Sequence, residues 1–243
     1  MLFFYMNPIL ITAAVIPAVF LLIFVYRADR LEPEPPGLLL SLIFGGILST
    51  GFALVTERLG TLLLNRSLPE ESLAYQALLY FVVVALSEEG FKYLLLRVRT
   101  WRSPSFNCQF DGVVYAVFVS LGFALWENIS YVLQFGLGTA LLRAVTAVPG
   151  HACFGVFMGA WYGLAKRWDN LGRPGFSRFC RLMALILPIF LHGCYDLIAS
   201  IETVHYGWIF VAFVTAMFLL ALLVIRHLSR NDRYLSVRAP FDY

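Results

Sequence analysis

The chain has 243 residues, of which 60% are hydrophobic and only 14% are charged, and its mean hydropathy is +0.78. This composition excludes an ordinary water-soluble domain and is typical of a polytopic helical membrane protein. The formal net charge of +3 gives no basis for a nucleic-acid partner, because the basic residues flank apolar runs instead of forming one face.

Seven apolar runs are each long enough to cross a hydrocarbon core about 30 Å thick as a helix. Together they leave no room for a separate soluble domain. The predicted fold is therefore all-α: a transmembrane bundle of about seven spans around a buried polar cavity, formed by a single domain over residues 1–243. The runs lie at residues 8–26, 37–56, 74–97, 112–133, 140–165, 182–200 and 207–226.

The first run follows an amino terminus without basic residues, which indicates a retained span and not a cleaved signal peptide. The connector after it, RADRLEPEPPG, is charged and rich in proline. If the amino terminus lies outside, only Arg58 and Arg66 among the basic loop residues fall in outer loops. This distribution predicts a multi-pass protein of the cell membrane with its amino terminus outside and its carboxyl terminus in the cytoplasm.

The third run, residues 74–97, contains Glu88, Glu89 and Lys92. A charged side chain at the centre of a bilayer costs at least about 2.5 kcal/mol, so these groups need partners. Lys92 follows the two glutamates by four and three positions, and it can therefore reach both carboxylates along one helix. We expect the ion pair to hold one carboxylate while the other points into a cavity.

The next three runs also carry polar side chains. At about 1.5 Å per residue, His151 and His192 reach nearly the same depth as Glu88, which predicts one shared polar site. Glu127 is placed several ångströms further outward, so either its span begins deeper or Glu127 caps the cavity on its outer side. The polar residues of these runs are Glu127 and Asn128, then His151, then His192 and Asp196.

Other residues near the spans have structural interpretations. Pro149 and Pro188 precede the two histidines and predict helices that bend around a hydrated pocket. Arg143 and Asp111 are expected to snorkel to the interface or to cap helices, and Glu57 is expected to be solvated. Gly155, Gly159 and Gly163 form a tandem GxxxG pattern that predicts close helix packing. The four cysteines are isolated in sequence and predict neither a disulfide nor a thiolate zinc cluster.

Four motifs in order resemble the PrsW family of bacterial membrane proteases. EEGFK, from Glu88 to Lys92, is similar to its EExxK motif, and FALWE, which ends at Glu127, is similar to its FxxxE motif. HGCYD, which begins at His192, is similar to its terminal HxxxD motif, and His151 occupies the intervening histidine position. The motifs lie within a core at about residues 74–200.

The wider superfamily includes the CAAX prenyl proteases and bacteriocin-processing relatives, with the pattern EExxxR, FxxxH and HxxxN. In this chain Tyr93 replaces the arginine and Glu127 replaces the second histidine. These differences favour the PrsW branch and argue against prenyl-protein substrates.

The resemblance implies a glutamate-dependent intramembrane peptidase that cuts a membrane-anchored protein, in some members an anti-sigma factor. Peptide hydrolysis needs a base for water and a donor for the oxyanion, and a carboxylate with imidazoles at one depth can supply both. We expect Glu88 to act as the base, with Glu89 and Lys92 as its charge-balancing partners. His151 and His192 are expected to position water and to stabilise the oxyanion. Asp196 is expected to orient His192, and Glu127 also belongs to the site.

No cofactor is expected, but two alternatives remain open at this stage. A catalytic zinc ion could be held by Glu88, His151 and His192, although the HExxH helix signature is absent. A proton-coupled carrier or a membrane scaffold could also bury such groups. The charges fall in consecutive middle spans and no internal repeat is visible, which favours the enzyme over a carrier. A scaffold predicts that substitutions impair assembly and not turnover.

Overall fold

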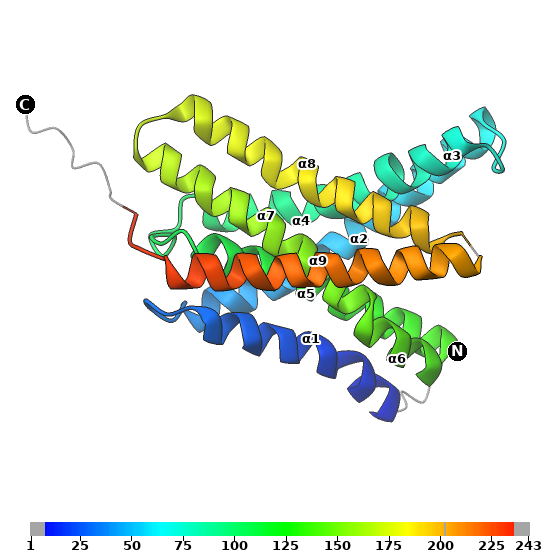
Figure 1. The fold of residues 1–243 in the computed structure, drawn as a ribbon, viewed down its shortest axis with the longest axis horizontal. Helices are drawn as coiled ribbons and strands as arrows, with labels where there is room; N and C mark the ends of the chain where they lie inside the picture. The colour runs from blue at the N-terminus through cyan, green and yellow to red at the C-terminus, as the bar shows by residue number, and fades with distance from the viewer. Residues whose placement is uncertain (1–7, 202, 236–243) are drawn as a thin grey trace, which may run out of the picture.

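The computed structural model describes residues 8–201 and 203–235, which form helices and one isolated antiparallel bridge between Cys108 and Tyr234 (Figure 1). The elements are α1 (Pro8–Ala28), α2 (Pro36–Ser67), α3 (Leu73–Leu78), the π-helix η1 (Leu79–Ala85), α4 (Leu86–Thr100), α5 (Asp111–Phe135), α6 (Leu137–Val145), α7 (Ala147–Asn170), α8 (Pro174–Ala199) and α9 (Val204–Arg230).

Within residues 8–201 and 203–235, six helical stretches are long and apolar enough to cross a membrane: α1, α2, α5, α6 with α7, α8 and α9. The predicted third span corresponds to α3, η1 and α4, which follow one another without interruption over residues 73–100. At about 1.5 Å per residue this stretch is about 42 Å long, enough to cross the bilayer despite its charges. The prediction of an all-α, polytopic bundle is confirmed.

The predicted fifth span, residues 140–165, comprises two helices. Its helix breaks at Thr146, where φ is −122° and ψ is −75°. Pro149 explains the break, because its ring would collide with the carbonyl group of Val145 if one helix continued through both residues. The α6 helix therefore ends at Val145, and Pro149 lies in the first turn of α7, where a missing N–H group is tolerated. By contrast, α8 continues through Pro188.

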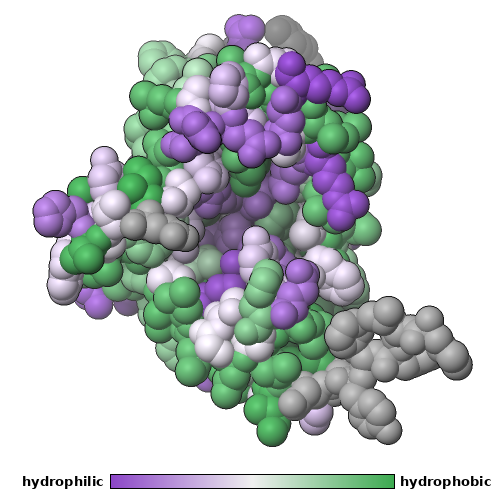
Figure 2. All heavy atoms as spheres, turned by 90° about the vertical axis from the view of Figure 1, so that its right-hand side faces the viewer, coloured by the Kyte–Doolittle hydropathy of each residue, from purple (hydrophilic) through white to green (hydrophobic). Residues whose placement is uncertain are grey.

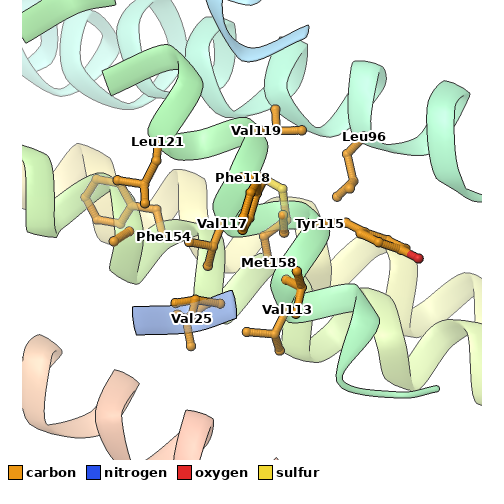
Figure 3. Close-up of a cluster of buried hydrophobic side chains, with 14 of the residues drawn as sticks. Val25, Leu96, Val113, Tyr115, Val117, Phe118, Val119, Leu121, Phe154 and Met158 are labelled. Carbon is orange, nitrogen blue, oxygen red and sulfur yellow. The ribbon is translucent and has the colours of Figure 1, made fainter. Parts of the chain in front are cut away.

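The centre of the bundle is α5, whose residues from Asp111 to Ala124 are all buried. Glycines allow its neighbours to approach its backbone closely. A Cβ atom built on Gly122 would overlap the backbone of α2, and one built on Gly159 would overlap the backbone of α5 at Gly112. The predicted packing role of the tandem GxxxG pattern is thus confirmed. Figure 3 shows the apolar side chains of α5 meeting those of the surrounding helices.

The outer helices present apolar side chains to their surroundings. Exposed large hydrophobic residues are frequent on α1, α2, α8 and α9, as expected for a surface in contact with lipid. The cysteines, which are Cys108, Cys153, Cys180 and Cys194, are all free thiols in the structure.

Candidate functional site

A wide helical turn precedes the two glutamates. The π-helix η1 ends three residues before Glu88, and such turns shift the register of the side chains that follow and occur frequently at functional sites. Phe81 of this turn packs directly on Gly193 of α8, where a Cβ atom would overlap the Phe81 ring. Gly193 follows His192, so this contact brings the glutamate helix against the histidine helix.

Lys92 is the centre of the polar cluster. Its Nζ lies 3.1 Å from Glu88 Oε2, 2.8 Å from Glu89 Oε1 and 3.1 Å from His151 Nδ1. It also lies 3.9 Å from the centroid of the Phe123 ring, an attractive cation–π arrangement. An ammonium group has three N–H donors, and here all three have an acceptor, so the buried charge is compensated.

His151 continues the cluster outward. Lys92 can only donate, so His151 Nδ1 accepts, and the ring proton must then lie on Nε2. His151 Nε2 is 3.0 Å from Glu127 Oε2 and donates to it. Glu127 also binds Arg143 of α6, whose Nη2 lies 2.6 Å from the same oxygen. One chain of contacts therefore links α4, α7, α5 and α6.

His192 connects the cluster to α8. Its Nδ1 lies 3.0 Å from Glu89 Oε1, which makes Glu89 the nearest group that orients the ring. Its Nε2 lies 3.4 Å from Asp196 Oδ2 and 3.9 Å from Glu88 Oε2. Phe154 stacks on the imidazole with ring centroids 4.8 Å apart. The ring is thus held on one face and at one nitrogen, while its other nitrogen lies among carboxylates.

A cavity of about 800 Å³ opens beside these groups, at the end of the bundle where α2, α5 and α8 end and α7 begins. Figure 2 views this end and shows a hollow with hydrophilic residues inside it. Glu89 and Lys92 are fully buried behind the cavity wall. The polar residues of the predicted site that line the cavity are Glu88, Glu127, His151, His192 and Asp196.

The structure brings all seven predicted site residues together, corrects two expectations and bears on the open question about Glu127. Arg143 does not snorkel: it pairs with Glu127 and also donates to Asn128 Oδ1 at 2.9 Å. Glu57 lies half-buried in the cavity wall and is not simply solvated. Of the two alternatives for Glu127, the structure supports the cap, because α5 begins at Asp111 and Glu127 lines the cavity together with Arg143.

The ion pair between Arg143 and Glu127 was not predicted, although the sequence contains a signal for it. An arginine inside an apolar run requires an anionic partner, and Glu127 was an acid in a neighbouring run without an assigned partner. Asp111 behaves as a cap, because its Oδ2 accepts the backbone N–H groups of Asn107 and Cys108.

Lys92 lies among the side chains of this cluster that could hold a metal ion. The side chains of Glu88, Glu89 and His151 each offer a ligand atom, and these atoms lie within 4.8 Å of one another, close enough to share a metal ion. This set contains Glu89 instead of the expected His192. Lys92 Nζ contacts all three of them. Both nitrogens of His151 are already engaged, so a cation could bind there only if it displaced the ammonium group.

The sequence of the chain is similar to those of known membrane proteases. Residues 34–223 match the PrsW family of intramembrane metalloproteases. The chain belongs to the PrsW family. It is 30% identical over 224 residues to Protease PrsW of Halalkalibacterium halodurans, which covers 92% of this chain and 99% of that protein. It is 36% identical over 188 residues to Protease PrsW of Geobacillus kaustophilus, 77% of this chain and 78% of that one.

Protease PrsW of Clostridioides difficile is 31% identical over 213 residues, 85% of this chain and 84% of its own length. No solved structure matches the chain. Membership of the PrsW family confirms the resemblance seen in the motifs, and the chain is an intramembrane protease with a membrane-embedded protein as its substrate.

Proposed function

We propose that the chain hydrolyses a peptide bond in the cavity with Glu88 as the general base for water. One observation carries this proposal: Glu88 is the carboxylate of the EEGFK segment that lines the cavity, whereas Glu89 is fully buried behind it. A general base must reach the water that it activates. Lys92 and His192, near one oxygen of Glu88, hold this carboxylate in place.

The chemistry uses groups already in contact. Glu88 takes a proton from water as the water oxygen bonds to the carbonyl carbon. The resulting oxyanion accepts a hydrogen bond from Nε2–H of His192, whose Nδ1–H donates to Glu89. When the carbon–nitrogen bond breaks, the proton on Glu88 passes to the leaving nitrogen. Three carboxylates around His192 favour the doubly protonated ring that this role needs.

The remaining polar residues of the site position Glu88 and His192. Glu89 orients His192 through Nδ1, and Lys92 balances the charges of both glutamates. His151 donates to Glu127 and accepts from Lys92, so we assign it to positioning and not to proton transfer. Asp196, 3.4 Å from His192 Nε2, stabilises the charged ring.

This mechanism requires no metal ion. The position of Lys92 among Glu88, Glu89 and His151 supports it, because a fixed ammonium group already supplies the positive charge that these ligands would share with a metal. The family description names a metalloprotease, so measurement of the metal content is a direct test of this part of the proposal.

We further propose that the protein lies in the cell membrane with its amino terminus outside, so that the cavity opens to the outer face. The distribution of arginines supports this orientation. The cavity then receives a protein with a single span near its outer membrane boundary, a class that includes membrane-anchored anti-sigma factors. Reporter fusions to the 171–173 turn test the topology, and an outside location for this turn would contradict it.

The function is tested with purified protein and a set of single-span substrates in detergent. We expect cleavage by the wild type, and a loss of about 10²- to 10⁴-fold in turnover in Glu88→Gln at an unchanged midpoint of thermal unfolding. Glu70→Gln, which removes an exposed carboxylate, is the matched control and should cleave normally. Retention of more than about a tenth of wild-type turnover by a folded Glu88→Gln variant would exclude Glu88 as the base.

A further inference from the structure

A second group of acids lies at the end of the bundle opposite the cavity, where α1 and α9 end and α2 and α5 begin (Figure 1). Asp29, Glu34 and Asp111 each offer a carboxylate oxygen, and these oxygens all lie within 4.8 Å of one another. Asp232, just after α9, forms a second group with Asp111 and Cys108, whose ligand atoms also lie within 4.8 Å of one another. We call Asp29, Glu34, Asp111 and Asp232 the acidic end cluster.

Two members of the acidic end cluster are almost completely buried, and each is hydrogen-bonded through only one of its two carboxyl oxygens. Glu34 is 2% exposed: its Oε2 accepts from the Tyr115 hydroxyl at 2.6 Å, while its Oε1 is buried without a partner. Asp111 is 1% exposed: its Oδ2 accepts from the backbone N–H groups of Asn107 and Cys108 at 2.9 Å and 2.7 Å, while its Oδ1 is buried without a partner.

The other two members repeat this pattern. Asp232 Oδ1 accepts from the backbone N–H of Phe110 at 3.1 Å, while its Oδ2 has no partner, and Asp29 Oδ2 is also buried and unpartnered. Among residues 8–201 and 203–235, no salt bridge joins any of these four carboxylates to a basic side chain. Each acid thus keeps one carboxyl oxygen that is buried without a hydrogen-bond partner.

We propose that the acidic end cluster binds a hard divalent cation, Ca²⁺ or Mg²⁺. A buried carboxylate oxygen without a partner is destabilising, and a divalent cation among these oxygens would supply the missing opposite charge. Carboxylate oxygens are the ligands that these two ions prefer. Opposite ligands of a Ca²⁺ ion, each at about 2.3–2.6 Å, are about 4.6–5.2 Å apart, and the oxygens of Asp29, Glu34 and Asp111 lie within 4.8 Å of one another.

A cation at this position would join three segments that are distant in sequence. Asp29 and Glu34 belong to the connector between α1 and α2, Asp111 begins α5, and Asp232 follows α9. Direct hydrogen bonds already link these segments: Tyr115 donates to Glu34, the Phe110 N–H donates to Asp232, and the Leu235 N–H donates to the Asn107 carbonyl at 2.6 Å. An ion would add to these contacts. The ion is therefore a structural clamp, independent of the proteolytic site and of its mechanism.

The test uses the full chain in detergent, treated with EDTA and then dialysed. Calorimetric titration with CaCl₂ and, separately, with MgCl₂ should show saturable binding of one ion per chain to the wild type, at or below about 1 mM. Asp29→Asn and Glu34→Gln should each weaken this binding about ten-fold or more, because ligand charge determines affinity. Both residues lie in the connector, outside the helices, so these variants leave every helical backbone hydrogen bond in place. Glu71→Gln is the charge-matched control and should bind normally.

Thermal unfolding gives a second measurement. CaCl₂ or MgCl₂ should raise the unfolding midpoint of the wild type and of Glu71→Gln, and should raise it less in Asp29→Asn and Glu34→Gln. Absence of saturable binding to folded wild-type protein would overturn the proposal and would indicate that protons neutralise the cluster. Undiminished binding in both connector variants would also overturn it. Binding of Zn²⁺ alone, lost in Cys108→Ser, would replace it with a thiolate site.

Discussion

His151 Nδ1 lies 3.1 Å from Lys92 Nζ, although the two residues belong to different helices, α7 and α4. Because the ammonium group has no lone pair, this contact determines the tautomer of the imidazole and directs its remaining N–H group to Glu127. The two motifs EEGFK and FALWE are therefore connected through a histidine that belongs to neither. The consequences can be measured in variants of each contact.

Removal of Lys92 should destabilise the protein more than any other single change in the cluster. Lys92→Met leaves Glu88 and Glu89 buried without their cation and leaves His151 Nδ1 without a donor. We expect the free energy of unfolding to fall by about 3–5 kcal/mol, with loss of activity. The double variant Glu89→Gln/Lys92→Met should recover about 0.5–3 kcal/mol of this loss, because one stranded charge is gone. Strictly additive effects in denaturant titrations would argue against the observed contact.

Arg143 should be required for stability through Glu127. Arg143→Met removes the ion pair at 2.6 Å and the hydrogen bond to Asn128, so we expect a clear decrease in the midpoint of thermal unfolding. Arg66→Met changes an exposed arginine at the end of α2 and should have little effect. Equal midpoints for the two variants would support the original expectation that Arg143 merely snorkels.

Two glycines of the motif helices should respond in opposite ways to the same substitution. In Gly193→Ala the new methyl group overlaps the Phe81 ring and pushes the π-helix away from α8, so activity and stability should both fall. Gly90, between Glu89 and Phe91, has open space around its would-be Cβ atom. Gly90→Ala should therefore be tolerated, with up to about 1 kcal/mol of added helix stability. A tolerated Gly193→Ala would contradict the close contact between η1 and α8.

Zinc should be dispensable for cleavage. If Lys92 supplies the positive charge between the glutamates and His151, 1,10-phenanthroline should leave turnover unchanged, and elemental analysis should find well under one zinc ion per chain. Calcium and magnesium are kept constant in this assay, so that the acidic end cluster does not contribute to the result. Stoichiometric zinc, with activity lost on chelation and restored by zinc alone, would establish a metal mechanism.

Much of the site could be predicted from residue type and spacing. Charged groups are costly in a bilayer, so Glu88, His151 and His192 at one depth had to share a site. The different environments of Glu88 and Glu89 could not be predicted, because adjacent residues point about 100° apart and the rotation of the helix depends on its neighbours. Here the π-helix and the Phe81 contact with Gly193 determine that rotation.

The class of the protein, the helical spans and the residues of the polar site could all be predicted without a structure, because hydrophobic length and the cost of buried charge are local properties of the chain. The pairing of the charges depends on how the helices pack. Arg143 binds Glu127, and Lys92 binds His151, since helix packing through Gly122 and Gly159 brings α2, α5 and α7 close enough for α4 and α6 to complete the cluster. Such pairings depend on distances between segments far apart in the chain, which neither composition nor periodicity contains.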